Sequence, residues 1–407
     1  MSNKHCWVFT DSIPYGNDEV FLKQELEISE KQYSKWVIFP LNPVGNLNPE
    51  LSNFTFVTLS NEEKYIPLRN IFFKHFLLIF KLTFAEIFVN KIYFLKNIRN
   101  SFFQLLNDIK IATAFIEHYD KNYKKGTILY SYWFDRWSNI LSIAKLFRPE
   151  LSFVSRAHAF DLYEEDNKNG IIPFRKFQLK QVSKVFTVSE HGEKYLVNKY
   201  PKYANKVTHR HLGSPDNGFS QNVLSGNELI LISCGSVQPR KRILDIPPML
   251  AMLKVPFHWF HVGDGPEFEK LKVSVSEFNL RNSITLLGRL NNEEFHQLLT
   301  THPNAIFISI SRNEGLPYTF MEAISHGTPI ISTDSMGCGE LVNENTGLLL
   351  PKGIDNMEIA AAIEKFYCEK SGDVEFRKNI RKYWEKNFNG LINYSSFHKS
   401  LCEDYAR

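Results

Sequence analysis

Two glutamates, Glu314 and Glu322, stand eight positions apart in the stretch NEGLPYTFMEAISHGTPII, on either side of a Gly-Leu-Pro turn. Ionised carboxylates do not bind phosphate, but they accept hydrogen bonds from hydroxyl groups. A pair at this spacing could therefore hold hydroxyl-rich parts of a ligand beside a phosphate. Such a site also needs a feature that binds the phosphate itself.

The elements around the two glutamates supply that feature. Residues 305–311 and 329–333 are short apolar runs with the branched and aromatic residues of buried strands. Between them the sequence predicts a helix, because Pro317 stands near its first position and Gly327 just after its last. The loop would leave the carboxyl end of a strand, where the first turn of the helix presents free N–H groups. Such a helix end is a phosphate site.

Three preceding loops carry related features. The loop in LISCGSVQPRKRILDI contains the basic triplet 240–242, whose Arg and Lys side chains suit a diphosphate, although a solvated charge run explains the triplet taken alone. Gly263 and Gly265 follow the next strand and permit close approach of a ligand, and Gly288 repeats the pattern one unit later. Four consecutive loops at one sheet edge thus share glycine, cation or carboxylate features, which favours a binding edge.

Composition bounds the class of protein. A chain of 407 residues predicts two or three domains, and 43% hydrophobic with 23% charged residues indicates an ordinary folded protein. A net charge of +4 without a zinc-finger or RNA-binding pattern argues against nucleic acid as a partner. Five scattered cysteines without a CxxC pair argue against a disulfide framework or a metal site and favour reduced thiols in the cytoplasm. We expect neither a signal peptide nor a membrane span.

The whole chain alternates short apolar runs with longer helical patterns, which is typical of parallel sheets with crossover helices. We therefore predict an α/β protein of two Rossmann-like doubly wound domains facing across a cleft. The interdomain break falls near 211–228, a stretch rich in Gly, Pro, Ser and Asn. The predicted strands are 6–10, 35–40, 54–59, 127–132, 153–158 and 184–189 in the first half, and 229–235, 258–263, 283–288, 305–311 and 329–333 in the second.

Residues 69–99 form a separate basic and aromatic segment, with six Lys or Arg against the single acid Glu86, among many Phe, Ile and Leu. A basic amphipathic helix suits an anionic membrane surface, where each basic residue contributes about 1 kcal/mol. A helix pair packed on the sheet, with lysines extending into solvent, explains the segment equally well.

The second half resembles the donor-binding domain of retaining glycosyltransferases of the GT-B fold, specifically family 4 (glycosyl transferases group 1). The resemblance is strong over 229–351 and rests on EGLPYTFME, AISHGTPIISTD, GSVQPRKR, GDGP, LLGRL and GELVNENTGLLLP. It implies domains at 1–215 (acceptor binding) and 216–380 (nucleotide-sugar binding), with a helical tail at 381–407 that returns to the first.

The resemblance also implies roles for individual residues. Glu322 would hold the nucleotide ribose, Glu314 the hydroxyls of the transferred sugar, and Lys241 the diphosphate. Backbone N–H groups of 316–319 would assist Lys241, and residues 288–290 would edge the base. The complete donor-binding set is Gly16, Ser236, Arg240, Lys241, Gly263, Gly288, Arg289, Leu290, Glu314, Gly315, Leu316, Pro317, Tyr318, Thr319 and Glu322.

The first half resembles the family in shorter stretches. SRAHAFDLYEE makes His158 the candidate beside the reacting carbon, so the catalytic set is His158, Glu314 and Lys241. TDSIPYGNDEVFLKQEL resembles the first phosphate-binding loop, but Asp18 stands where a second glycine is common. Ser236 likewise replaces a common arginine, so either Arg240 or Arg242 substitutes for it or the diphosphate is stabilised less.

The reaction implied is sugar transfer from a nucleotide-diphosphate sugar to a growing surface polysaccharide or lipid-linked oligosaccharide. No Asp-x-Asp occurs in the sequence, so we expect an enzyme that needs no metal ion, and we expect no cofactor. We expect the enzyme to be a hexosyltransferase. Its expected location is the cytoplasm, peripheral at the inner face of the plasma membrane. The resemblance implies a front-face displacement that retains configuration. A nucleotide-sugar epimerase, a phosphorylase and a catalytically silent nucleotide-sugar-binding scaffold share the architecture and remain alternatives.

Overall fold

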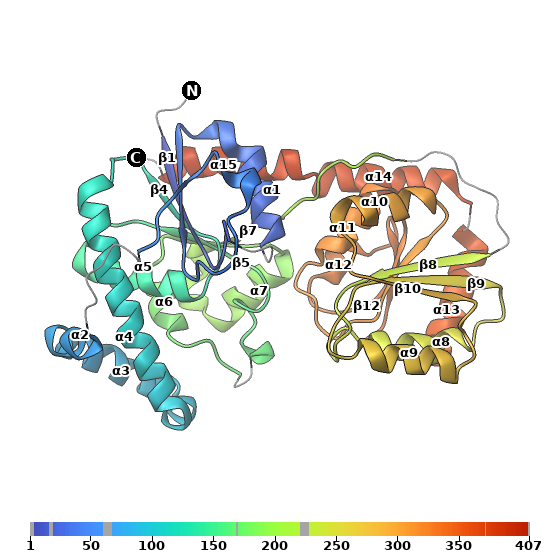
Figure 1. The fold of residues 1–407 in the computed structure, drawn as a ribbon, viewed down its shortest axis with the longest axis horizontal. Helices are drawn as coiled ribbons and strands as arrows, with labels where there is room; N and C mark the ends of the chain where they lie inside the picture. The colour runs from blue at the N-terminus through green and yellow to red at the C-terminus, as the bar shows by residue number, and fades with distance from the viewer. Residues whose placement is uncertain are drawn as a thin grey trace. The chain divides into compact units, whose positions relative to one another are not determined.

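The computed structural model describes residues 4–15, 19–59, 67–167, 170–219, 228–370 and 372–405. Two predicted features, Gly16 and Asp18, lie outside these residues. The chain forms two compact units: Met1–Arg210 with Tyr394–Arg407, and His211–Asn393 (Figure 1). Relative to the predicted division at 215/216 and 380/381, the C-terminal unit therefore extends through residue 393, and the segment from Tyr394 onward belongs to the N-terminal unit.

The N-terminal unit contains a seven-stranded parallel sheet in the order β3-β2-β1-β4-β5-β6-β7. Six strands coincide with the predicted apolar runs, because both faces of a parallel sheet are covered and its strands are apolar throughout. The last strand was not predicted. The strands are β1 His5–Thr10, β2 Lys35–Pro40, β3 Thr55–Phe56, β4 Ile128–Ser131, β5 Val154–Ala157, β6 Lys184–Thr187 and β7 Val207–His209.

Helices cover this sheet and extend from it. They are α1 Val20–Ser29, α2 Leu68–Lys74, α3 Phe76–Val89, α4 Lys91–Asn122, α5 Arg136–Phe147, α6 Arg175–Gln181, α7 Glu190–Lys199 and the C-terminal part of α15 Gly390–Tyr405. Polar residues fix several helix starts: the Ser189 hydroxyl accepts the N–H of Gly192 at 3.0 Å and begins α7. Within the described residues, no helix is long and apolar enough to cross a membrane.

A buried charged group joins α15 to the sheet of the N-terminal unit. The Glu25 carboxylate of α1 accepts hydrogen bonds from Arg156 of β5 and, at 3.1 Å, from the Tyr130 hydroxyl of β4. His398 Nε2 of α15 lies 2.9 Å from Glu25 Oε1. Burial opposes ionisation of this carboxyl, but Arg156 and His398 hold the pKa of Glu25 below its ordinary value. The last helix is thereby anchored beneath the first.

The C-terminal unit contains a six-stranded parallel sheet in the order β10-β9-β8-β11-β12-β13. Its strands are β8 Leu229–Cys234, β9 Phe257–Val262, β10 Ile284–Gly288, β11 Ile306–Ser309, β12 Ile330–Thr333 and β13 Gly347–Leu350. Its helices are α8 Ile246–Leu250, α9 Phe268–Glu277, α10 Asn292–Thr301, α11 Tyr318–Ser325, α12 Cys338–Leu341, α13 Asn356–Lys370 and α14 Val374–Asn387. The predicted fold class, α/β with two Rossmann-like doubly wound domains, is confirmed.

Candidate functional site

The predicted cations and the first glutamate meet at the carboxyl edge of the C-terminal sheet. Lys241, in the loop after β8, donates a hydrogen bond from Nζ to the carboxylate of Glu314, in the loop after β11. Arg240 Nη1 lies 3.3 Å from the same carboxylate and donates to the Asn313 carbonyl at 2.6 Å. The strands β8 and β11 are neighbours, so their following loops bring together residues more than seventy positions apart.

Arg242 takes a different role from its neighbours. Its backbone is left-handed, with φ of 54°, and its Nε donates to Asp245 at 2.7 Å within the same loop. Of the two arginines that were predicted to replace the missing one at position 236, only Arg240 lies beside Glu314. Ser236 itself is exposed, as is Arg289.

The second glutamate, Glu322, is on α11 and is 3% exposed. Its Oε1 has no hydrogen-bond partner among the described residues and lies 3.5 Å from His296 Nε2. The thiol of Cys234 lies within the electrostatic influence of both groups: burial and, to a smaller extent, the Glu322 carboxylate raise its pKa to about 12, and Lys241 acts in the opposite direction. Glu322, Cys234 and Lys241 therefore share one electrostatic environment.

The first turn of α11 lies between the two glutamates. The helix begins after Pro317, which has no side chain to cap the first N–H groups, and Gly315 and Leu316 before it are buried. Tyr318 and Thr319 form its first positions. The structure thus places a helix N-terminus between a loop carboxylate and a helix carboxylate, as the spacing predicts.

The glycines of the neighbouring loops have a packing role. A Cβ added at Gly263 would lie 2.0 Å from the carbonyl oxygen of Gly235, and one at Gly265 would lie 2.6 Å from that of Val237. These glycines therefore permit the loops after β8 and β9 to touch each other, and the close approach is between protein backbones. Gly288 differs, because a Cβ added there meets no described atom within 4 Å, although its φ of +67° favours glycine.

His158 belongs to the N-terminal unit, in the loop after β5. Its ring is 8% exposed and lies against Trp133 and Tyr132, with ring centroids 4.3 and 4.8 Å away. Its backbone N–H donates to Asp161 Oδ1 at 2.7 Å. Neither ring nitrogen has a hydrogen-bond partner among the described residues, and Nδ1 lies 3.6 Å from Asp161 Oδ2.

Glu19 is a site feature that the sequence analysis missed. Its buried carboxylate accepts the backbone N–H groups of Asp11, Ser12 and Ile13, at 3.1, 2.9 and 2.7 Å, and the indole N–H of Trp133 at 2.5 Å. Successive backbone N–H groups of this kind form an anion-binding concavity. At the end of β1, the protein's own carboxylate occupies that concavity. An acid directly after a glycine-containing loop was the available signal.

Metal ligands are not clustered in the described part of the chain: no group of three or more His, Cys, Asp or Glu residues there could hold a metal ion. The recognisable features are instead paired carboxylates, two cations and an uncapped helix end, all in the C-terminal unit. Such a set can bind a diphosphate together with hydroxyl-bearing groups.

Comparison with known proteins shows sequence similarity in the C-terminal unit and similarity of fold over the chain. Residues 216–387 match the family model "Glycosyl transferases group 1". The O-antigen biosynthesis glycosyltransferase WbnH of Escherichia coli is 35% identical over 158 residues, which are 38% of this chain and 42% of that relative. The match therefore spans less than half the length of that relative.

Two solved structures show the same fold over nearly the whole chain. The lipopolysaccharide outer core galactosyltransferase WaaB has a TM-score of 0.71 at 13% identity, covering 98% of this chain and 99% of that one. Anabaena Alr3699/HepE, determined in complex with UDP, has a TM-score of 0.69 at 14% identity, covering 98% and 100%. The C-terminal unit thus resembles the glycosyl transferases group 1 family over residues 216–387, and the chain as a whole has the fold of these two solved structures.

Proposed function

We propose that this protein is a retaining, metal-independent glycosyltransferase that moves a hexose from a nucleotide-diphosphate sugar to a growing surface polysaccharide or lipid-linked oligosaccharide. The observation that carries the proposal is the meeting of Lys241, Arg240 and Glu314 beside the first turn of α11. A relative named for O-antigen biosynthesis and a structural neighbour solved with UDP support the choice of substrates.

Lys241 and Arg240 are proposed to stabilise the leaving group of the reaction, the nucleoside diphosphate. Transfer places negative charge on the departing diphosphate, and preorganised positive groups stabilise that charge in the transition state. Lys241 donates a hydrogen bond to Glu314, so a diphosphate competes with this carboxylate for the ammonium group. Binding of the donor thus draws Lys241 towards the phosphates and frees Glu314 to accept hydrogen bonds from the sugar.

The second carboxylate binds the other end of the donor. Glu322 Oε1 is buried and lacks a hydrogen-bond partner among the described residues, which is costly for an acceptor. A ribose hydroxyl of the nucleotide supplies the missing donor. The uncapped N–H groups at the start of α11 hold the diphosphate between the two glutamates.

His158 is the residue that the N-terminal unit contributes to the reaction. Both ring nitrogens lack partners among the described residues although the ring is buried, so a bound hydroxyl or phosphate oxygen would satisfy them. In the proposed front-face displacement the leaving phosphate accepts the proton of the acceptor hydroxyl. His158 positions the transferred sugar, and no separate general base is required.

The segment 69–99 makes the proposed contact with the inner face of the plasma membrane. Helices α2 and α3 expose Phe73, Phe80, Phe84 and Phe88, the last of them 85% exposed. The only acid of the segment, Glu86, is buried, and burial raises its pKa. The exposed surface therefore combines aromatic rings with cations, which suits an anionic lipid surface. The exposed cations are Arg69 and Lys74 on α2 and Lys81 on α3, and Arg99 of α4 is exposed as well.

Two experiments on the purified full chain test this function. A panel of nucleotide sugars is first screened by thermal shift, because a ligand that binds only the folded protein raises its stability. The stabilising nucleotide sugar is then incubated with and without a glycan acceptor. We expect nucleoside diphosphate release that depends on the acceptor and is abolished in Glu322→Ala, while Glu369→Ala, an exposed substitution on α13, retains it.

The alternatives give different results in the same assay. Conversion of the donor sugar without an acceptor would indicate an epimerase, and a requirement for inorganic phosphate would indicate a phosphorylase. Binding of a nucleotide sugar without turnover on any acceptor would indicate a silent scaffold. Each of these outcomes would overturn the proposed transfer.

A further inference from the structure

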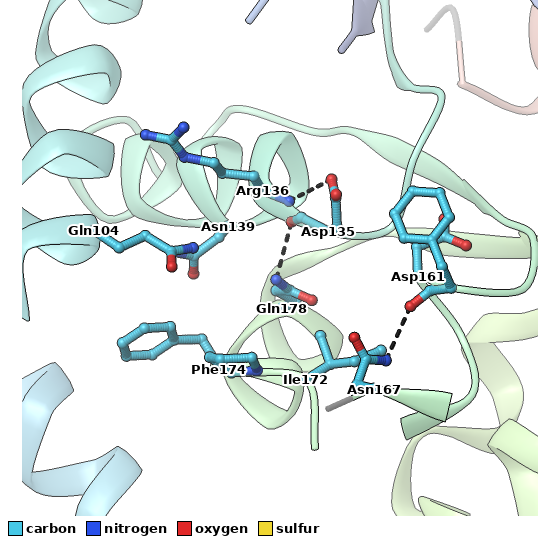
Figure 2. Close-up of a pocket in the computed structure, with 11 residues that line it drawn as sticks. Gln104, Asp135, Arg136, Asn139, Asp161, Asn167, Ile172, Phe174 and Gln178 are labelled. Atoms are coloured by element: carbon cyan, nitrogen blue, oxygen red, sulfur yellow. Dashed lines mark hydrogen bonds between the residues drawn. The ribbon is translucent and has the colours of Figure 1, made fainter. Parts of the chain in front are cut away.

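A cavity of about 240 Å³ lies in the N-terminal unit, among α4, α5, α6 and the loop after β5 (Figure 2). None of the predicted donor-binding residues that the structure describes lines it. Its wall combines amide side chains, two carboxylates and two phenylalanine rings. The cavity is smaller than the pockets of about 300–1,000 Å³ that hold drug-sized ligands, so its occupant is a small group.

Two amide groups in the wall are incompletely hydrogen-bonded. Gln178, 2% exposed, donates from Nε2 to the Asp135 carbonyl at 3.0 Å, but its Oε1 has no partner among the described residues (Figure 2). Asn139, 3% exposed, donates from Nδ2 to Asp108 at 2.9 Å, and its Oδ1 also lacks a partner there. Buried acceptors without donors are rare in folded proteins, so the pair indicates a ligand that brings its own donors.

The charged groups of the cavity restrict the ligand further. Asp135 and Asp161 both line it, and burial, with a smaller contribution from repulsion by Asp161, raises the pKa of Asp135 to about 7. Two acids disfavour a phosphate or carboxylate. Arg136, whose Nε donates to Asp108 at 2.8 Å, lines the same cavity and disfavours a cation. The remaining class is a neutral ligand rich in hydroxyl groups.

Aromatic rings complete the surface. Phe160 lines the cavity and is 54% exposed, so one face of its ring is open to a ligand. Its centroid lies 4.8 Å from that of Trp133, which in turn lies 4.3 Å from His158. Asp161 connects the same places, because it lines the cavity and accepts the backbone N–H of His158. Two residues of the cavity wall, Phe160 and Asp161, therefore contact Trp133 and His158.

We infer that this cavity binds one neutral sugar residue of the acceptor glycan, with its hydroxyls donating to Gln178 Oε1 and Asn139 Oδ1 and its apolar face against Phe160. The inference rests on the proposed function for the identity of the ligand as an acceptor. On this inference, the loop after β5 selects the acceptor, and the same loop carries His158, which is proposed to position the transferred sugar.

Binding to the full chain is measured without nucleotide, by saturation-transfer NMR with the methyl glycosides of glucose, galactose, mannose and N-acetylglucosamine. We expect at least one glycoside to bind, and Phe160→Ala and Gln178→Met to weaken its binding at least tenfold. Gln181→Met, on the same helix but outside the cavity, is the matched control and leaves binding unchanged. Phe160→Ala keeps the test valid if Gln178→Met fails to fold, because Phe160 is half exposed.

A transfer assay supplies the second measurement. The two cavity variants are expected to raise KM for the acceptor at least tenfold and to leave KM for the nucleotide sugar unchanged. Equal binding by wild type and both variants, or binding of glucosamine but of no neutral glycoside, would overturn the inference. If the protein binds a glycoside but shows no transferase activity, the proposed function is refuted and the cavity assignment stands. If the protein is an active transferase and both variants keep the wild-type KM for the acceptor, the cavity assignment is refuted and the proposed function stands.

Discussion

Replacing Lys241 by methionine removes the ammonium group at the predicted diphosphate site while keeping most of the side-chain volume. Lys241 is the less exposed of the two cations beside Glu314, at 19% against 45% for Arg240. A charge in a partly buried site is screened less than one in water, so Lys241 contributes more to stabilising the leaving group. Loss of one preorganised stabilising group of this type lowers kcat by about 10²–10³, or about 3–4 kcal/mol.

The same substitution has a smaller effect on folding. Glu314 loses its closest partner but keeps Arg240 at 3.3 Å and is not left uncompensated. We therefore expect a loss of about 1–3 kcal/mol in the free energy of unfolding of the C-terminal unit, which urea denaturation measures.

The assay is release of nucleoside diphosphate at saturating donor and acceptor, with circular dichroism to verify folding. Lys270→Met on α9, whose side chain is 70% exposed, is the matched control and should retain wild-type kcat. Arg240→Met should reduce kcat by a smaller factor than Lys241→Met, because Arg240 is more exposed. Activity within threefold of wild type in a folded Lys241→Met variant would refute the reasoning.

Three other perturbations probe the rest of the molecule. Arg156→Met removes the guanidinium that pairs with the buried Glu25 carboxylate, which keeps only its hydrogen bonds with Tyr130 and His398. The substitution should lower the free energy of unfolding by about 3–5 kcal/mol, measured by urea denaturation, and a loss below 1 kcal/mol would contradict the buried pairing. Burial raises the pKa of Asp108 to about 6 from an ordinary value near 3.8. The folded protein therefore binds this proton more tightly than the unfolded chain does. The resulting stabilisation is fully present below pH 3.8 and is lost as the pH rises through about 6. The free energy of unfolding of Asp108→Asn should therefore rise relative to that of wild type by up to about 3 kcal/mol between pH 4 and pH 7. If the difference between the two proteins does not depend on pH, the raised pKa of Asp108 is refuted. Replacing Phe84 and Phe88 together by serine should reduce binding to vesicles that contain anionic lipid by more than tenfold in co-sedimentation, because burying each phenylalanine contributes about 1.5–3 kcal/mol. Val273→Ser, an exposed substitution on α9, is the control and should have no effect. Equal binding by wild type and both variants would refute the membrane contact.

The sheet strands were predictable because a parallel sheet is covered on both faces and its strands are continuously apolar. This rule missed two short strands. The strand β7 has only three residues, Val207–His209, and no apolar run, while β13 was recognised only as part of the motif GELVNENTGLLLP. β7, of sequence VTH, is too short and too polar to give an apolar signal, whereas β13, of sequence GLLL, is apolar but has only four residues.

The meeting of Lys241 with Glu314 was also predictable, because neighbouring parallel strands deliver their following loops to one edge. The role of Gly263 was not. Glycine permits close approach of any group, and only the structure identifies that group as the backbone of Gly235.

Contacts that depend on the exact path of a loop or the packing of helices could not be predicted from the sequence. Glu19 binds three successive N–H groups because the chain turns at Asp11, Ser12 and Ile13, and no spacing rule describes that turn. The cavity arises in the same way from the packing of α4, α5 and α6, whose amides are unremarkable in the sequence.

The most direct test of the central claim is a crystal structure of this chain with a bound nucleoside diphosphate. The account predicts Lys241 Nζ within hydrogen-bond distance of a phosphate oxygen, the phosphates at the N-terminus of α11, and the Glu322 carboxylate on the ribose. A nucleotide that binds elsewhere, with Lys241 still paired to Glu314 and Glu322 without a ligand contact, would contradict it.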